Sequence, residues 1–134
     1  MLFRSLRWYD ISSFDTSEVT DMSYMFSHCS SLKEINLSSF NTNQVTRMSW
    51  MFYNCSSLKE LDLSSSFNTN QVISMSRMFN NCSSLKKLDL SSFNTNQVTN
   101  MSRMFYSINK KCKRKCKDEK IKKEFENSTG CIII

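Results

Sequence analysis

The sequence of 134 residues contains no proline, one glycine and one histidine. Glycine and proline supply most tight turns, so turns in this chain have to be made by other residues, chiefly asparagine. A zinc site on Cys112 and Cys116 would need two further ligands, and none is spaced nearby. The single histidine, His28, is expected to be an ordinary surface residue, and the sequence predicts no bound metal.

Long apolar runs are also missing. No stretch approaches the ~20 consecutive apolar residues that span a membrane, and the N-terminus lacks the apolar core of a signal peptide. We therefore expect a chain kept in the reducing cytosol, where cysteines stay free. No paired set of acids, bases or nucleophiles stands out, so we expect neither an enzyme nor a cofactor.

What the sequence does contain is a repeat. Residues 45–63, V-T-R-M-S-W-M-F-Y-N-C-S-S-L-K-E-L-D-L, recur as residues 19–37 and 72–90 and begin again at Val98. The Met-Phe pairs begin at residues 25, 51, 78 and 104, which gives spacings of 26, 27 and 26. Periods of ~20–50 residues are typical of stacked repeats and solenoids. The one extra residue lies in a run of serines at 64–66, where we expect a local bulge.

Two periodicities alternate within each copy. Apolar residues in the pattern L-x-x-L-x-L predict short strands near 35–37, 61–63 and 88–90. In residues 98–105 the apolar positions 98, 101, 104 and 105 predict a helix of about two turns. Stacking the copies in parallel gives an α/β solenoid of about four coils, each with one short strand and one short helix.

The connecting stretch S-S-F-N-T-N-Q is expected to bury its phenylalanine and to turn through asparagines in the left-handed conformation. Neither end shows an obvious cap, which predicts fraying or end-to-end self-association. A cysteine recurs in one column and is expected to be a buried thiol. These columns contain Phe14, Phe40, Phe67 and Phe93, and Cys29, Cys55 and Cys82.

The text V-T-x-M-S-x-M-F-x-x-C-S-S-L-K-x-L-D-L-S-S-F-N-T resembles the leucine-rich repeat of the BspA-like surface proteins, a variant also found in mycoplasma lipoproteins. The resemblance covers residues 6–106. It implies a leucine-rich-repeat solenoid that binds proteins at cell surfaces, with no catalytic residues to carry over. Protozoan members with prenylation-type C-termini make the last four residues of this chain of interest.

The net charge rises after the repeat ends. Residues 1–108 hold nine basic and eight acidic side chains, a net charge of +1, whereas residues 109–126 hold nine and four, a net charge of +5. We therefore divide the chain into a repeat domain (1–108), a helical or disordered basic tail (109–130) and a terminal box (131–134).

The final residues, G-C-I-I-I, fit a C-a-a-X prenylation box, with Cys131 as the modified residue. Cys112 and Cys116 are candidates for palmitate, with free thiols as the alternative. A basic cluster would add attraction to anionic lipids, and one lipid chain plus a polybasic segment is the usual requirement for stable anchoring. The cluster comprises Lys110, Lys111, Lys113, Arg114, Lys115 and Lys117. Nucleic-acid binding is disfavoured because aromatic residues are not interleaved with the basic ones.

Candidate partner-binding residues lie where the copies differ. They are the outward strand residues Trp8, Glu34, Glu60 and Lys87, and the positions Tyr24, Trp50, Arg77 and Arg103 in the predicted helices. Exposed Tyr24 and Trp50 on one side would suit a protein interface.

The sequence thus predicts a protein-interaction module held on the cytosolic face of a membrane, with the plasma membrane expected, by a prenylated polybasic tail. One alternative is a cell-surface adhesin, or a fragment of one, that binds host or matrix proteins. A second alternative is a truncated gene copy without function.

Overall fold

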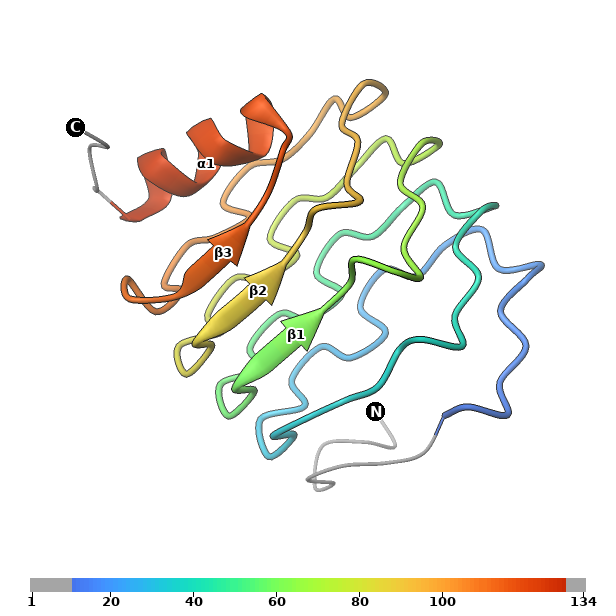
Figure 1. The fold of residues 1–134 in the computed structure, drawn as a ribbon, viewed down its shortest axis with the longest axis horizontal. Helices are drawn as coiled ribbons and strands as arrows, with labels where there is room; N and C mark the ends of the chain where they lie inside the picture. The colour runs from blue at the N-terminus through green and yellow to red at the C-terminus, as the bar shows by residue number, and fades with distance from the viewer. Residues whose placement is uncertain (1–10, 130–134) are drawn as a thin grey trace.

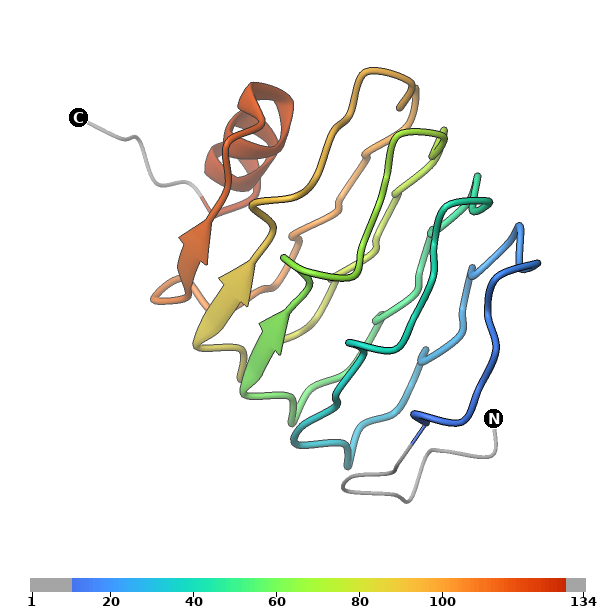
Figure 2. The ribbon, with the colours of Figure 1, turned by 45° about the vertical axis from the view of Figure 1, so that its right-hand side comes forward.

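The computed structural model describes residues 11–129. Its regular elements are three strands and one helix, namely β1 (Glu60–Asp62), β2 (Lys87–Asp89), β3 (Lys113–Lys115) and α1 (Glu119–Thr129) (Figure 1). The strands form a parallel sheet in the order β1-β2-β3. Between strands the chain makes a full circuit, so that successive copies of the repeat stack face to face as repeat units (Figures 1 and 2).

The strand side of the stack follows the predicted leucine columns. Leu61 pairs with Leu88, and Leu88 with Arg114. Strands β1 and β2 each begin one residue before the predicted position. Residues 35–37, predicted as a strand, form none, although the Lys59 N–H donates to the Lys33 carbonyl at 3.1 Å and joins that unit to the sheet.

The helix predicted in each Met-Phe segment is wrong. These segments, residues 22–28, 48–54, 75–81 and 101–107, form turns instead of helices. They pair in parallel through isolated bridges, which are Asp21↔Arg47, Arg47↔Ser74 and Ser74↔Asn100. The stack therefore has a second ladder, which we call the turn side, opposite the strand side.

Hydrogen bonding explains why no helix forms there. Every second N–H donates to the next unit, as when Trp50 bonds the Ser76 carbonyl and Phe52 the Met78 carbonyl, both at 2.9 Å. The N–H of Met51, between them, closes a turn on the Met48 carbonyl at 3.3 Å. Apolar steps of three and four residues thus arise from tight turns as well as from helices.

The tight turns depend on residues in the left-handed conformation. Two columns four residues apart have φ between 55° and 64°. They comprise Tyr24, Trp50, Arg77 and Arg103, and His28, Asn54, Asn81 and Ser107. Such a residue costs roughly 1–2 kcal/mol when it is not glycine. The expectation that connecting-stretch asparagines would take this conformation is wrong, because their side chains accept bonds instead, as from the Asn43 N–H to Asn41 Oδ1 at 3.0 Å.

Stacked aromatic rings run through the core. Phe26, Phe52, Phe79 and Phe105 form one row with centroid separations of 5.5, 5.6 and 5.7 Å. A second row joins Phe40, Phe67 and Phe93 at 6.5 and 6.3 Å. Phe14, expected to be buried, is 45% exposed because it lies at the end of this column.

Buried polar groups are bonded between units. The Thr42 hydroxyl donates to the Asn68 carbonyl and accepts the Asn68 N–H, at 2.9 and 2.8 Å, and Thr16 and Thr69 repeat this pair of bonds. The recurring cysteines are buried thiols that form no disulfide, as predicted. Cys55 and Cys82 donate to the carbonyls of Phe26 and Phe52 at 3.1 and 3.2 Å.

The C-terminal end of the stack is capped, contrary to expectation. Strand β3 continues the sheet, and α1 covers the last unit with Ile121 and Phe125, which are buried. The Phe125 ring lies 5.1 Å from Phe105 and ends the first phenylalanine row. Cys112, Ile121 and Phe125 belong to the same buried cluster as the repeat columns, so the segment after residue 108 packs against the repeat core.

Two carboxylates in this cap replace the missing next unit. Asp118 accepts the Thr95 hydroxyl and N–H at 2.8 and 2.9 Å, and also the Ile121 N–H at 3.1 Å as the N-cap of α1. The backbone of Arg103 and Met104 favours the charged form of Glu124, in the segment whose earlier copies donate to the next unit. Without Asp118, the Thr95 hydroxyl and N–H would lack these partners at the end of the stack.

Candidate interaction surfaces

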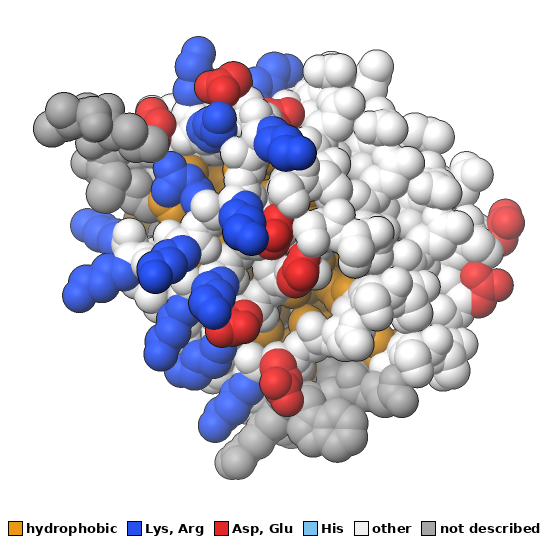
Figure 3. All heavy atoms as spheres, in the orientation of Figure 1, with side chains coloured by type: hydrophobic (Ala, Val, Ile, Leu, Met, Phe, Trp, Pro, Cys, Tyr) orange, Lys and Arg blue, Asp and Glu red, His pale blue; other side chains and the backbone are white. Residues whose placement is uncertain are grey.

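Lysine side chains gather over β3 and its flanks, as Figure 3 shows on the face that carries the sheet. Lys113 and Lys115 project from β3, and Lys110, Lys111 and Lys117 flank it; all five are exposed. We call these five side chains the basic surface. Only part of the predicted cluster is free to meet a membrane, because Arg114 is half-buried with its guanidinium 3.9 Å from the centre of the Phe125 ring.

An open groove of about 490 Å³ crosses the sheet beside the basic surface. Its charged lining contains three carboxylates and four cations. They are Glu60, Asp62 and Asp89, and Lys87, Lys113, Arg114 and Lys115. Exposed ion pairs join Glu60 to Lys87 at 3.5 Å and Asp89 to Lys115 at 4.0 Å, so much of the groove charge is offset locally. Glu34 is exposed on the preceding unit.

The two cysteines proposed for palmitate differ in access. Cys112 occupies the buried place that Leu58 and Leu85 fill in earlier units, and its exposure is 6%. Burial raises the pKa of the Cys112 thiol to about 11. The Cys112 thiol therefore exposes little surface in the folded chain, and its modification with palmitate stays a prediction. Cys116 is half-buried against the core, and its pKa is also raised, mainly by burial. Cys131 and Trp8 lie outside the described residues.

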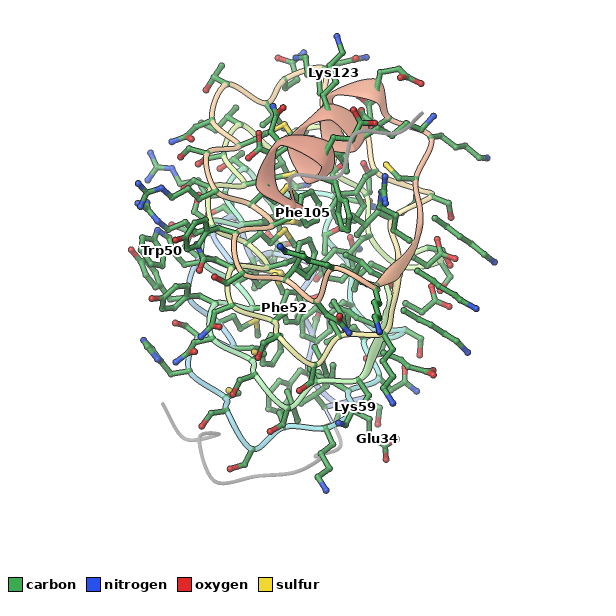
Figure 4. All side chains as sticks on the ribbon, turned by 90° about the vertical axis from the view of Figure 1, so that its left-hand side faces the viewer. Glu34, Trp50, Phe52, Lys59, Phe105 and Lys123 are labelled. Carbon is green, nitrogen blue, oxygen red and sulfur yellow. The ribbon has the colours of Figure 1, made fainter. Side chains whose placement is uncertain are left out.

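The turn side carries a row of stacked side chains. The Tyr24 and Trp50 rings are parallel to within 17°, with centroids 5.7 Å apart, and the Arg77 guanidinium lies 4.6 Å from the Trp50 ring on the next unit. Arg103 continues the column and contacts Tyr106 instead, at 5.8 Å. We call Tyr24, Trp50, Arg77 and Arg103 the ridge. Figure 4 shows Trp50 on the side of the stack opposite Glu34 and Lys59.

An open groove of about 770 Å³ runs along the turn side next to the ridge. Tyr24 and Trp50 line it, and Ile73, which is 40% exposed, adds an aliphatic contact. Hydroxyl groups of Ser49 and Ser74, bonded to each other at 2.6 Å, also line it. Charged lining comes from Asp21 and Arg47. We call this the turn-side groove; it touches all four repeat units.

A polar ladder that the sequence did not reveal lies on the same side. Asn81 donates to the Asn54 side-chain oxygen, and Asn54 in turn donates to His28 Nδ1 at 3.0 Å. The His28 ring also meets the edge of Tyr53 at 5.1 Å. His28 is therefore a structural member of this column and not the plain surface residue that we expected. His28 lies one repeat period before Asn54, which lies one period before Asn81, and this spacing could have placed His28 in the same column.

The strand-side carboxylates Asp62 and Asp89 each accept the backbone N–H of the serine two residues further along the chain. Asp62 accepts the Ser64 N–H at 2.9 Å, and bonds from Ser64 lower its pKa. Among the described residues, no three side chains of the metal-binding types come together. Within residues 11–129, no helix has both the length and the apolar character needed to cross a bilayer.

A scan of family models matches nearly the whole chain. Residues 2–65 and 62–128 each match the family described as Mycoplasma protein of unknown function, DUF285. The chain belongs to the DUF285 family. The second DUF285 match runs through β3 and most of α1, so the basic segment falls within the family unit, as the structure also indicates. No curated protein and no solved structure matches the chain.

Proposed function

We propose that this DUF285 protein is a non-enzymatic protein-interaction module of the leucine-rich-repeat type, related to the BspA-like repeats. The stacked units, the parallel sheet and the buried leucine columns support a solenoid of this kind. Solenoids use extended surfaces built from neighbouring repeats to bind partners. The observation that carries the proposal is the presence of outward-facing, variable side chains on a regular stack of units that share one continuous hydrophobic core.

We further propose that the module is held on the cytosolic face of a membrane. Prenylation of Cys131 would supply one anchor and the basic surface a second, since each lysine near an anionic leaflet contributes about 1 kcal/mol. The five lysines of the basic surface are exposed together, which supports this arrangement. Cys116 remains a candidate for additional palmitate, although its thiol has to leave the core surface to react.

Membrane fractionation of cells expressing the full chain tests the anchor. Cys131→Ser should move the protein to the soluble fraction, whereas Cys116→Ser should weaken attachment less. Membrane association that is unchanged in Cys131→Ser would refute prenyl anchoring. Mass analysis of the native C-terminus reports the modification directly.

Binding to anionic vesicles tests the basic surface separately. Lys111→Gln with Lys117→Gln removes two charges and should weaken binding by about 30-fold at low salt, from about 1 kcal/mol each. Lys59→Gln, an exposed lysine two units from β3, is the matched control. Equal loss in the control would argue against a localised basic surface.

The adhesin alternative predicts a different exposure to protease. Protein on the outer surface of intact cells is digested by added protease, whereas protein on the cytosolic face is protected. The truncated-copy alternative depended on missing caps, and the cap formed by β3 and α1 weakens it. Cooperative unfolding of the purified chain would weaken it further.

A further inference from the structure

The ridge places large side chains where the backbone would favour glycine. Trp50 and Arg77 have φ of 63° and 55°, in a region where bulky residues are uncommon. Both side chains are half-buried. Strained backbone of this kind clusters at active sites and ligand-binding sites. Tyr24 and Arg103 occupy the same column, so each of the four repeat units presents one long side chain from a left-handed turn.

The charges around the turn-side groove are unbalanced. Arg47 and Asp21 are the charged residues of the groove lining, and Arg77 and Arg103 belong to the adjoining ridge, so this side of the stack carries three arginines and one groove carboxylate. Asp21 accepts the Ser23 N–H at 2.8 Å and is also attracted to Arg47, so it offsets one of the three positive charges. None of the three arginines forms an ion pair within the described residues. The surface therefore complements a ligand with carboxylates.

The groove has the dimensions of an extended polypeptide. Neighbouring units lie about 4.8 Å apart, as hydrogen-bonded strands do, so the four units span roughly 15 Å, the length of about four or five extended residues. Tyr24 (57% exposed) and Ile73 offer apolar contacts along one part of this length. Serine hydroxyls in the lining offer hydrogen bonds to a backbone.

Aromatic rings beside arginines also occur in proteins that bind single-stranded nucleic acid, where free ring faces stack on bases. Here the ring faces are largely used within the ridge. Trp50 has Tyr24 stacked on it and the Arg77 guanidinium against it, so no open stacking platform remains on Trp50. This arrangement favours a peptide over a nucleic acid.

We propose that the ridge and the turn-side groove bind an extended acidic peptide segment that carries an apolar side chain. The proposal deepens the interaction function proposed above and rests on it. Tyr24, supported by the Trp50 ring stacked against it, and Ile73 would pack against the apolar side chain, while Arg77, Arg103 and Arg47 would pair with carboxylates. The strand side, with the basic surface, would remain free to face a membrane, because the two sides lie on opposite faces of the stack (Figure 4).

Selection from a random dodecapeptide display library against the full chain tests the proposal. Selected peptides should be rich in Asp and Glu and contain an aromatic or aliphatic residue. Trp50→Gly and Arg77→Gly delete the side chains while keeping left-handed turns that glycine accepts readily. Each variant should weaken binding of the selected peptides at least about tenfold.

Two matched controls separate the surface from the fold. Ser107→Gly makes the same backbone change at φ 58° but away from the groove, and should leave affinity unchanged. Lys59→Gln alters an exposed lysine on the strand side and should also have no effect. Thermal unfolding of each variant confirms that the chain is folded.

Three other results would overturn the proposal, and each points to a different conclusion. Selected peptides whose binding is lost in Lys59→Gln but kept in Trp50→Gly would leave an interaction module with its site on the strand side. Failure to enrich any peptide would reject a peptide site, while the fractionation result for Cys131→Ser would still stand by itself. Binding of a poly-dT oligonucleotide that Trp50→Gly abolishes would identify a nucleic-acid site instead.

Discussion

The hydroxyl of Thr95 donates to the carboxylate of Asp118 at 2.8 Å, in the position where Thr69 meets the backbone of Asn94 in the preceding unit. The Asp118 carboxylate thus accepts the hydrogen bond that a backbone carbonyl of the next unit accepts elsewhere in the stack. The same carboxylate begins α1 by accepting the Ile121 N–H. Capping of the stack and initiation of the helix are therefore coupled through a single residue.

Replacing Asp118 should destabilise the fold more than its position near the end of the sequence suggests. Asp118→Ala removes a helix N-cap and leaves the buried Thr95 groups unpaired, which together should cost about 2–4 kcal/mol. Urea unfolding followed by circular dichroism measures this change. Glu119→Ala, which loses only an exposed pair with Lys122, should cost less than about 1 kcal/mol.

The two capping carboxylates should respond to pH in opposite directions. Burial alone would raise the pKa of Asp118, but hydrogen bonds from Thr95 and from backbone N–H groups outweigh it and lower the pKa. Asp118 therefore stabilises the fold above its unfolded pKa of about 4, and this contribution is lost as the pH falls further. Asp118→Asn should flatten that acid limb of the stability curve.

Glu124 has a raised pKa, mainly because it is partly buried, so its protonated form is favoured in the folded chain. Its contribution is fully present below the unfolded pKa and is lost as the pH rises through the folded value. Glu124→Gln keeps an acceptor for the backbone N–H groups and should match or exceed the wild-type stability at pH 7. The difference in stability between Glu124→Gln and the wild type should vanish at acidic pH, where Glu124 is protonated. Unfolding midpoints of the wild type and of both variants between pH 3 and pH 7 test whether the Asp118 and Glu124 contributions to stability change with pH in opposite directions.

Removing the last ring of the phenylalanine row should be severe. Phe125 is 2% exposed and contacts both Phe105 and Arg114. Phe125→Ala should cost about 3–5 kcal/mol, as other buried phenylalanine truncations do. Tyr106→Ala, at a side chain 54% exposed, is the control and should change stability little. Similar losses for the two variants would contradict the capping role of α1.

Glycine should stabilise a left-handed position. Ser107→Gly, at φ 58°, relieves backbone strain and should raise stability by about 1 kcal/mol. Ser83→Gly, at an exposed position without positive φ, should lower stability by about 0.5–1 kcal/mol. Thermal melts of the two variants should therefore shift in opposite directions.

Thiol labelling should rank the cysteines by burial. Cys55 and Cys82 are fully buried, and burial raises both pKa values, that of Cys82 to about 12. A maleimide at neutral pH should modify half-buried Cys116 first among the described cysteines, and Cys112 much more slowly. Mass spectrometry of digested, labelled protein gives the order. Rapid labelling of Cys55 in the folded state would contradict the buried column.

The leucine, phenylalanine and cysteine columns could be predicted because a period of 26 or 27 residues repeats each buried position several times. The turn structure could not, since a helix and a run of tight turns both place apolar residues three and four apart. Exposed Tyr24 on the ridge was predicted from variation between copies, but its stacking on Trp50 needed the geometry of the turns.

The cap was missed because its residues do not resemble the repeat. Arg114 occupies the leucine column, and because all three residues of β3 are basic, the sequence of β3 does not resemble that of the earlier strands. Ile121 and Phe125, four residues apart in a lysine-rich stretch, were the available signal for an amphipathic helix. Asp118 before that stretch was the matching N-cap signal.

The Met-Phe segments give the stack a direction. Their inter-unit bonds run from the N–H of one unit to the carbonyl of the next. Additional copies of the repeat could therefore be spliced between existing ones without disturbing either terminus, whereas a copy fused after α1 would meet a surface already closed by carboxylates. Such a protein can be lengthened by internal insertion, and an engineered insertion should consist of complete repeats of 26 or 27 residues placed before residue 98.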